Sequence, residues 1–153
     1  MSKSESGTEL GFADTNVWLY ALLATQDAGK SLQAQAIIRD RPLIISAQVV
    51  NEVSVNLIRK AGFIESQIQE LIASFYERHT VVPLERGTLL QASQLRGRYQ
   101  FSFWDSLMVA SALAGNARVL YSEDMQDGMV LENRLRIANP FRPTVGAVSG
   151  PGT

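Results

Sequence analysis

The chain has 153 residues, of which 46% are hydrophobic and 19% are charged, and its formal net charge is −1. This composition is typical of a single globular domain, and it excludes wholesale disorder and collagen-like repeats. The absence of cysteine excludes disulfides, thiolate metal sites and a cysteine nucleophile. Because His79 is the single histidine, a polyhistidine metal site is excluded too. Any metal ion must therefore be held by oxygen atoms, mostly from carboxylates.

Apolar runs are too short to cross a membrane. None approaches the ~20 residues that a bilayer requires, and residues 1–9 are polar and lack the apolar core of a signal peptide. We therefore expect a cytoplasmic protein without membrane contact. We expect a polar N-terminal segment over residues 1–9, one domain over 10–141, and a flexible tail rich in proline and glycine over 142–153.

Short apolar runs alternate with segments of helical spacing along the chain. Strands are predicted at residues 10–13, 43–45, 80–82, 119–121 and 135–138. Helices are predicted at residues 17–23, 32–39, 48–59, 64–75, 89–95 and 104–114, and the third and fourth helices are expected to form a hairpin on one side. This alternation predicts an α/β fold with a mostly parallel sheet that is covered on both faces.

Four acids are predicted to meet at one edge of this sheet. Asp14 directly follows the first strand, and Asp124 follows the strand at 119–121. Asp105 lies in the first turn of the helix at 104–114, and Glu52 lies in the first half of the helix at 48–59. Ligands of parallel sheets bind beyond the carboxyl ends of the strands, and helices that follow strands begin at that edge. We therefore expect the four carboxylates to converge on one rim.

Each acid also has a structural interpretation. Asp14 is a good N-cap for the helix that follows it. Ser102 and Asp105 have the spacing of a capping box, Glu52 belongs to a polar stripe typical of a solvated helix face, and Asp124 lies in a turn-prone segment. For any single acid the structural interpretation is the better one, but four such acids on one rim favour a shared cause.

A divalent cation is the physical cause that fits such a cluster. Two carboxylates ~4 Å apart repel each other by about 1 kcal/mol in water and by about 4 kcal/mol at an effective dielectric constant of 20. Clustered acids would therefore destabilise the fold and be partly protonated unless a cation neutralised them. Mg²⁺ or Mn²⁺ takes oxygen ligands and keeps several waters, and an activated water can attack phosphorus. The pattern thus indicates a metal-dependent nuclease.

Four segments together resemble the PIN-domain ribonucleases of the VapC toxin type. Their order and rough spacing hold from residue 10 to about 141, and they are ADTN at 13–16, SAQVVNE at 46–52, FWDSLMVASA at 103–112 and LYSEDM at 120–125. The resemblance implies a three-layer α/β/α sandwich around a mostly parallel sheet of about five strands. It also implies Mg²⁺- or Mn²⁺-dependent cleavage of RNA in the cytoplasm by the toxin of a type II toxin–antitoxin system. The partners that it implies are an RNA substrate, a cognate antitoxin protein and a second copy of the chain in a homodimer.

The resemblance also implies roles for individual residues. Asp14 and Asp105 would be the principal metal ligands, and Glu52 and Asp124 would complete the acidic cluster. Beside them, Thr15, Asn16 and Ser122 would donate hydrogen bonds that orient the carboxylates. The segment after Asp124 departs from the family pattern, so that Asp127 is a second candidate for the role of Asp124.

The main alternative function is a catalytically inactive PIN-like module that binds protein or RNA. A receiver domain needs paired acids after its first strand and a late lysine, whereas Asp14 stands alone and no lysine follows Lys60. A dinucleotide-binding domain needs Gly-x-Gly-x-x-Gly after a strand, and the sequence has no such motif.

Some further side chains have weaker interpretations. His79 is expected at the surface or at a strand edge, and the tryptophans Trp18 and Trp104 are expected in the core. The candidates for contacts to an RNA backbone are Arg59, Lys60, Arg96 and Arg98, which a solvated surface explains equally well.

Overall fold

A computed structural model describes residues 9–23 and 27–141. The expected tail at 142–153 and all but the last residue of the expected N-terminal segment at 1–9 lie outside the described residues. No helix in these two described ranges is long and apolar enough to cross a membrane.

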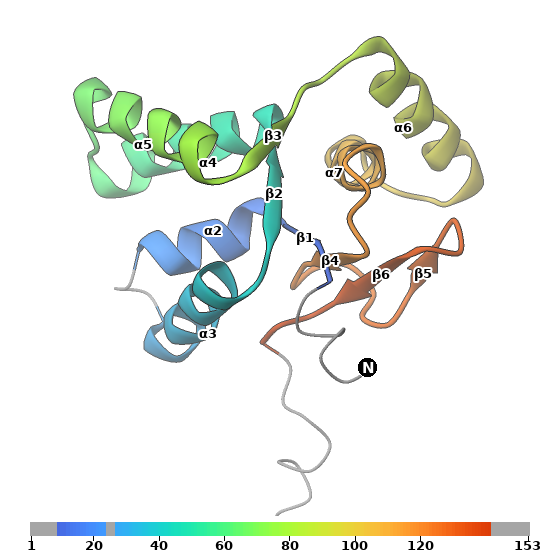
Figure 1. Ribbon diagram of the computed structural model, residues 1–153, viewed down its shortest axis with the longest axis horizontal. Helices are drawn as coiled ribbons and strands as arrows, with labels where there is room; N and C mark the ends of the chain where they lie inside the picture. Colours follow the sequence, from blue (N-terminus) through green and yellow to red (C-terminus); the bar gives the residue numbers. More distant parts are fainter. Residues whose placement is uncertain (1–8, 24–26, 142–153) are drawn as a thin grey trace, which may run out of the picture.

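A single twisted sheet forms the middle layer of the described chain (Figure 1). Its strand order is β3-β2-β1-β4-β6-β5. The first five strands of this order run parallel, and β5 pairs with β6 in the antiparallel direction. The strands are β1 (Gly11–Ala13), β2 (Leu43–Ser46), β3 (Thr80–Val82), β4 (Val119–Tyr121), β5 (Val130–Leu131) and β6 (Leu135–Ala138). The expected mostly parallel sheet is confirmed, and the short β5 is an addition to it.

Helices cover both faces of the sheet. They are α2 (Thr15–Leu22), α3 (Ala28–Asp40), α4 (Ala47–Ala61), α5 (Glu65–Arg78), α6 (Arg86–Arg98) and α7 (Phe103–Ala114). Figure 1 shows α2 to α5 on one side of the sheet and α6 and α7 on the other. The predicted three-layer α/β/α architecture is therefore confirmed, including the hairpin of α4 and α5.

Side-chain caps fix where the helices near the sheet edge begin. The carboxylate of Asp14 accepts a hydrogen bond from the backbone N–H of Val17 at the start of α2. In the same way Ser46 caps α4 and Ser102 caps α7. Such caps satisfy N–H groups that have no partner inside the helix. Because β1 and β2 run directly into α2 and α4, these caps hold both helix starts at the carboxyl edge of the sheet.

The core lies between the sheet and the two helical layers. Its largest fully buried side chains come from the strands and from the inner faces of the helices, and they include Phe12, Ile45, Leu57, Leu120 and Ile137. Burial of this apolar surface is the main force that holds the layers together.

One tryptophan prediction is confirmed and the other is wrong. Trp18 is buried, and its ring packs edge-on against His79 with 5.2 Å between the ring centroids. His79 directly precedes β3, in agreement with the expected place at a strand edge. Trp104, by contrast, is 58% exposed. It lies in the first turn of α7.

Close packing at the end of α7 depends on a residue without a side chain. A Cβ atom on Gly115 would lie 2.4 Å from Ile44 Cδ1 and 2.9 Å from Val82 Cγ2, both of which belong to buried core side chains. At Gly97, near the end of α6, a Cβ atom would meet nothing within 4 Å. The C-cap Gly115 is therefore closely surrounded by core side chains, whereas Gly97, in the last turn of α6, has open space around it.

We predict that Gly115→Ala destabilises the protein by about 1–3 kcal/mol, because the core must shift to admit the methyl group. The matched variant Gly97→Ala should instead gain up to about 1 kcal/mol, because alanine favours the helix. Urea denaturation followed by circular dichroism measures both free energies of unfolding. Equal effects of the two substitutions would contradict the close packing at Gly115.

Candidate active site

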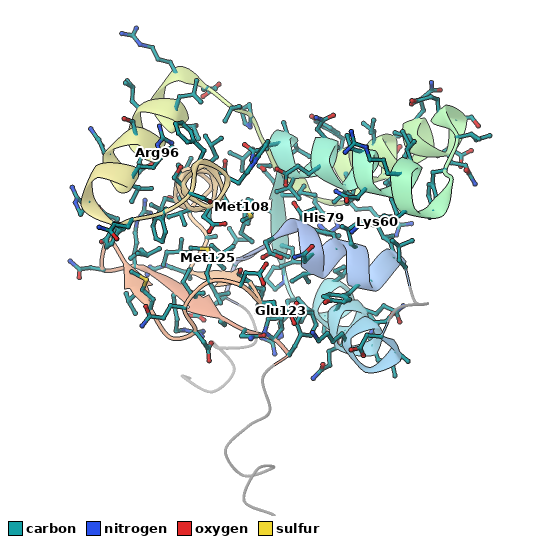
Figure 2. The ribbon with its side chains drawn as sticks, turned by 180° about the vertical axis from the view of Figure 1, so that it is seen from behind. Lys60, His79, Arg96, Met108, Glu123 and Met125 are labelled. Atoms are coloured by element: carbon teal, nitrogen blue, oxygen red, sulfur yellow. The ribbon has the colours of Figure 1, made fainter. Side chains whose placement is uncertain are left out.

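The structure brings all four predicted acids to one small pocket. This pocket has a volume of about 100 Å³ and is lined by Asp14, Thr15, Asn16, Glu52, Asp105, Met108 and Asp124. The lining comes from the junction of β1 and α2, from α4, from α7 and from the segment after β4. Figure 2 labels Met108, which lines the pocket from α7, and Glu123, which directly precedes Asp124 in the sequence. We call this cavity the acidic pocket.

Strand pairing explains how two of the acids meet. Ala13 of β1 pairs with Tyr121 of β4, and the backbone N–H of Asp14 donates to the carbonyl oxygen of Tyr121 at 3.0 Å. The two chain segments therefore leave the sheet side by side. As a result, Ser122 lies within hydrogen-bonding reach of the Asp14 carboxylate. The charge of Asp124 is close enough to raise the pKa of Asp14.

The carboxyl group of Asp14 is buried, and only 4% of this residue is exposed. The pKa of Asp14 is raised to about 6, mainly by burial and in smaller part by the negative charge of Asp124. Hydrogen bonds from Ser122 and from the backbone N–H of Val17 act in the opposite direction. The helix cap therefore only partly compensates the cost of removing this charge from water.

Asp105 is the second acid whose proton affinity is raised. Its side chain is half-buried, which raises its pKa, and the charge of Asp124 adds to this effect while the side chain of Ser102 opposes it. Within residues 9–23 and 27–141, none of the four pocket acids forms an ion pair with a basic side chain. The repulsion inside the acidic pocket is thus not balanced by a cation of the described chain.

Neutral donors hold the other two carboxylates. The hydroxyl of Thr15 donates to Glu52 Oε1 at 2.5 Å, and Gln48 Nε2 donates to Glu52 Oε2 at 3.3 Å. Asn16 Nδ2 lies 3.4 Å from Asp124 Oδ2 as a long hydrogen bond. Glu52 lies on the polar face of α4 that was expected to be solvated, yet its carboxylate accepts these two side-chain hydrogen bonds. Hydrogen bonds of this kind orient ligating carboxylates in metal sites.

Two adjacent acids after β4 have different surroundings. Asp124 lines the acidic pocket, whereas Glu123 pairs with Lys30 and accepts a hydrogen bond from Tyr20 at 3.1 Å. Because Lys30 and Tyr20 come from α3 and α2, this contact ties the segment after β4 to the helical layer. The sequence contained no signal for it, since 93 residues separate Lys30 from Glu123.

Asp127 does not share the position of Asp124. Its carboxylate accepts a hydrogen bond from the backbone N–H of Asn139 at 2.8 Å, and it does not line the acidic pocket. Of the two candidates that the sequence left open, only Asp124 lies beside the other acids.

The donor set of the acidic pocket fits a hard divalent cation. All of its titratable groups are carboxylates, and oxygen donors are the ligands that Mg²⁺ and Mn²⁺ prefer. In the described part of the chain no three His, Asp or Glu side chains are gathered as a preformed ligand set. A magnesium ion does not require one, because it is commonly held by one or two carboxylates and keeps several waters.

The basic residues that were candidates for RNA contacts lie in different environments. Arg98 pairs with Glu132. Arg96 donates to Ser106 Oγ at 2.8 Å, and its guanidinium carbon lies 3.8 Å from the centroid of the Phe103 ring. Lys60 lines a cavity of about 140 Å³ that Asn16, a residue of the acidic pocket, also lines.

We predict that Asp14 makes stability depend on pH. Its pKa is raised from 3.8 to about 6 on folding, so its proton stabilises the fold at low pH, and this contribution is lost as the pH rises through about 6. Asp14→Asn keeps the cap and removes the charge. In chelator at pH 7.5 this variant should be more stable than the parent by roughly 2–3 kcal/mol, and the difference should shrink towards pH 4. Urea denaturation across this range measures it, and parallel stability curves would contradict the raised pKa.

Solved structures with the same fold include three from toxin–antitoxin systems. A toxin–antitoxin complex from Klebsiella pneumoniae is 16% identical, with a TM-score of 0.65 over 87% of this chain and 99% of that chain. VapC20 of Mycobacterium tuberculosis, described as a sarcin–ricin loop cleaving toxin, is 20% identical, with a TM-score of 0.62 over 74% of this chain and 89% of its own. VapBC2 of Rickettsia felis, bound to a promoter DNA fragment, is 18% identical, with a TM-score of 0.59 over 85% of this chain and 99% of that chain.

At these identities the likeness establishes the fold alone. The search of curated proteins returned no match. The sequence itself matches the family profile described as the PIN domain over residues 12–126. This range includes all four pocket acids, all six described helices, and β1 to β4 apart from Gly11. The chain therefore belongs to the PIN-domain family.

Proposed function

We propose that this protein is a divalent-metal-dependent endoribonuclease, the toxin component of a type II toxin–antitoxin system, that acts in the cytoplasm. The observation that carries the proposal is the acidic pocket, in which four carboxylates from distant parts of the chain lie together without a basic partner among the described residues. Membership of the PIN-domain family supports the nuclease chemistry. The toxin role is supported by the similarity of the fold to a toxin–antitoxin complex and to the toxin VapC20.

In this proposal each residue of the acidic pocket has a defined task. Asp14 and Asp105 would hold a Mg²⁺ or Mn²⁺ ion, and Glu52 and Asp124 would complete its surroundings directly or through water. When bound, such an ion would supply a water of lowered pKa and would neutralise charge on the phosphate. Thr15 and Asn16 keep Glu52 and Asp124 turned towards the pocket through the hydrogen bonds described above.

The chain's own residues also limit how the site can move. The cap that Asp14 forms at α2 ties its carboxylate to the backbone N–H of Val17, and its own N–H is bonded to β4. Asp105 is held in the first turn of α7, whose start is fixed by the side chain of Ser102. The two principal ligands thus lie on rigid elements, which is the arrangement that precise positioning of a reacting group requires.

Protein partners belong to the same proposal. A cognate antitoxin would restrain the nuclease, and the chain would act as a homodimer. A cavity of about 550 Å³ lies between α2, α3 and α5, and its lining includes Trp18, Leu71 and Phe75 with Arg39 and Arg78. It contains none of the four acids, so it suits a protein contact better than the chemistry. The alternative function is a PIN-like module that binds protein or RNA without cleaving it.

We predict that Asp14→Asn and Asp105→Asn each reduce Mg²⁺-dependent cleavage of RNA by at least about 100-fold while circular dichroism remains native. Asp127→Asn is the matched control, because Asp127 lies outside the acidic pocket, and it should keep the parent activity. Gel analysis of labelled total RNA measures the rates. Full activity in both pocket variants would disprove the assigned site, and an inactive parent that still binds RNA would favour the module.

Metal binding can be tested without any substrate. We predict that Mn²⁺ or Mg²⁺ at millimolar concentration raises the melting temperature of the parent, because an ion that binds only the folded state stabilises it. The shift should be absent in Asp14→Asn and Asp105→Asn and unchanged in Asp127→Asn. Differential scanning fluorimetry measures it, and an equal shift in all four proteins would indicate that the ion binds elsewhere.

A further inference from the structure

A second, larger pocket adjoins the acidic pocket and shares Asp105 with it. Its volume is about 350 Å³, within the range of roughly 300–1,000 Å³ that holds small organic ligands. Its other lining residues come from the α6–α7 junction and from the segment between β4 and β5, and they are Tyr99, Gln100, Phe101, Met125, Gln126 and Met129. We call it the side pocket. Figure 2 labels Met125 of the side pocket and Met108 of the acidic pocket.

We propose that the side pocket binds one unpaired nucleobase of the RNA strand whose phosphate lies at the acidic pocket. This inference rests on the proposed ribonuclease function and adds to it a site that selects single-stranded RNA. Because Asp105 lines both pockets, the two pockets are direct neighbours. A nucleotide whose phosphate lies at the four acids would therefore have its base within reach of the side pocket.

The walls of the side pocket suit a flat aromatic ligand. The rings of Tyr99 and Phe101 are 5.4 Å apart between centroids and tilted by 32°. Both are held in place, since the backbone N–H of Phe101 donates to the carbonyl of Tyr99 at 3.0 Å and the Tyr99 hydroxyl donates to Glu132 at 3.2 Å. Aromatic rings and methionine side chains are favourable neighbours for the face of a base.

The mouth of the side pocket offers hydrogen-bonding groups for the edge of a base. Gln100 and Gln126 are exposed, and their side-chain amides form no hydrogen bond with any residue in the described ranges. Each amide offers a donor and an acceptor, which is the combination that reads base edges. A neutral base also suits the nearby carboxylates, Asp105 and Asp124, better than an acidic peptide does.

Geometry favours a single strand over a duplex. In an A-form helix the bases are stacked and paired, and proteins read RNA sequence mostly from unpaired bases that stack on aromatic side chains. A pocket that encloses one base beside the reacting phosphate therefore requires the strand to be open at that position. The side pocket would thus restrict cleavage to loops and other unpaired segments.

The test uses the full chain and single-stranded RNA hexamers in which one abasic residue is moved along the strand. Binding is measured by fluorescence anisotropy with the acidic pocket unchanged and with Ca²⁺ in place of Mg²⁺, so that an ion that takes oxygen ligands is present while cleavage is suppressed. An abasic residue at one position should weaken binding about 10-fold, as loss of one stacked base does. Phe101→Leu and Gln100→Ala should lose most of this penalty, whereas Tyr76→Ala, an exposed aromatic on α5, should keep it.

The outcomes separate this inference from the proposed function. If the parent cleaves RNA but the abasic penalty is the same in all variants, the nuclease stands and the base site is wrong. If the parent does not cleave RNA but the position-dependent penalty requires Phe101, the base site stands and the nuclease proposal fails. If the hexamers do not bind, or if the variants change only self-association of the chain, the base site is overturned.

Discussion

Repulsion among carboxylates that cannot move apart is the constraint on which this site depends. Asp14 is fixed by its helix and by β4, and Asp105 is fixed in the first turn of α7. Burial is the main cause of the raised pKa of both residues, and because neither backbone is free to relax, the charge of Asp124 adds a smaller contribution to each. The fold thereby keeps an arrangement that local electrostatics oppose, and such arrangements are concentrated at functional sites.

The structural and functional interpretations of Asp14 are both true of one side chain. One oxygen caps α2, as the local sequence predicts, while burial beside Asp124 makes the same carboxyl group unusually basic. A cap alone would be equally well served by a solvated aspartate, whose pKa stays low. The buried position is therefore the part of the arrangement that helix formation does not explain, and it is the part that points to a site.

Local patterns were sufficient to predict the layers and the position of the acids. The apolar runs at 80–82, 119–121 and 135–138 became β3, β4 and β6 with the predicted bounds. The two-residue β5 was missed because Val130 is exposed and the run is too short for alternation to be visible. Trp104 was misplaced because hydrophobicity does not reveal which helix turns lie beyond the sheet. The contact of Glu123 with Lys30 and the side pocket depend on residues far apart in sequence, which a single sequence without an alignment does not connect.

The two neighbouring pockets divide the demands of the proposed reaction. The acidic pocket is small and charged, and in the proposed reaction its groups would act on a phosphate that every RNA residue carries, so it would offer no basis for selecting a sequence. The side pocket is larger and combines aromatic and methionine side chains with polar groups, and stacking on its rings would be tolerant of base identity. Any preference among bases must then come from Gln100 and Gln126, which lie in exposed segments rather than in the core. In this proposal the cleavage reaction would depend on acids held at the rigid sheet edge, and base specificity would depend on surface residues. Such surface residues can be substituted without disturbing the buried acids.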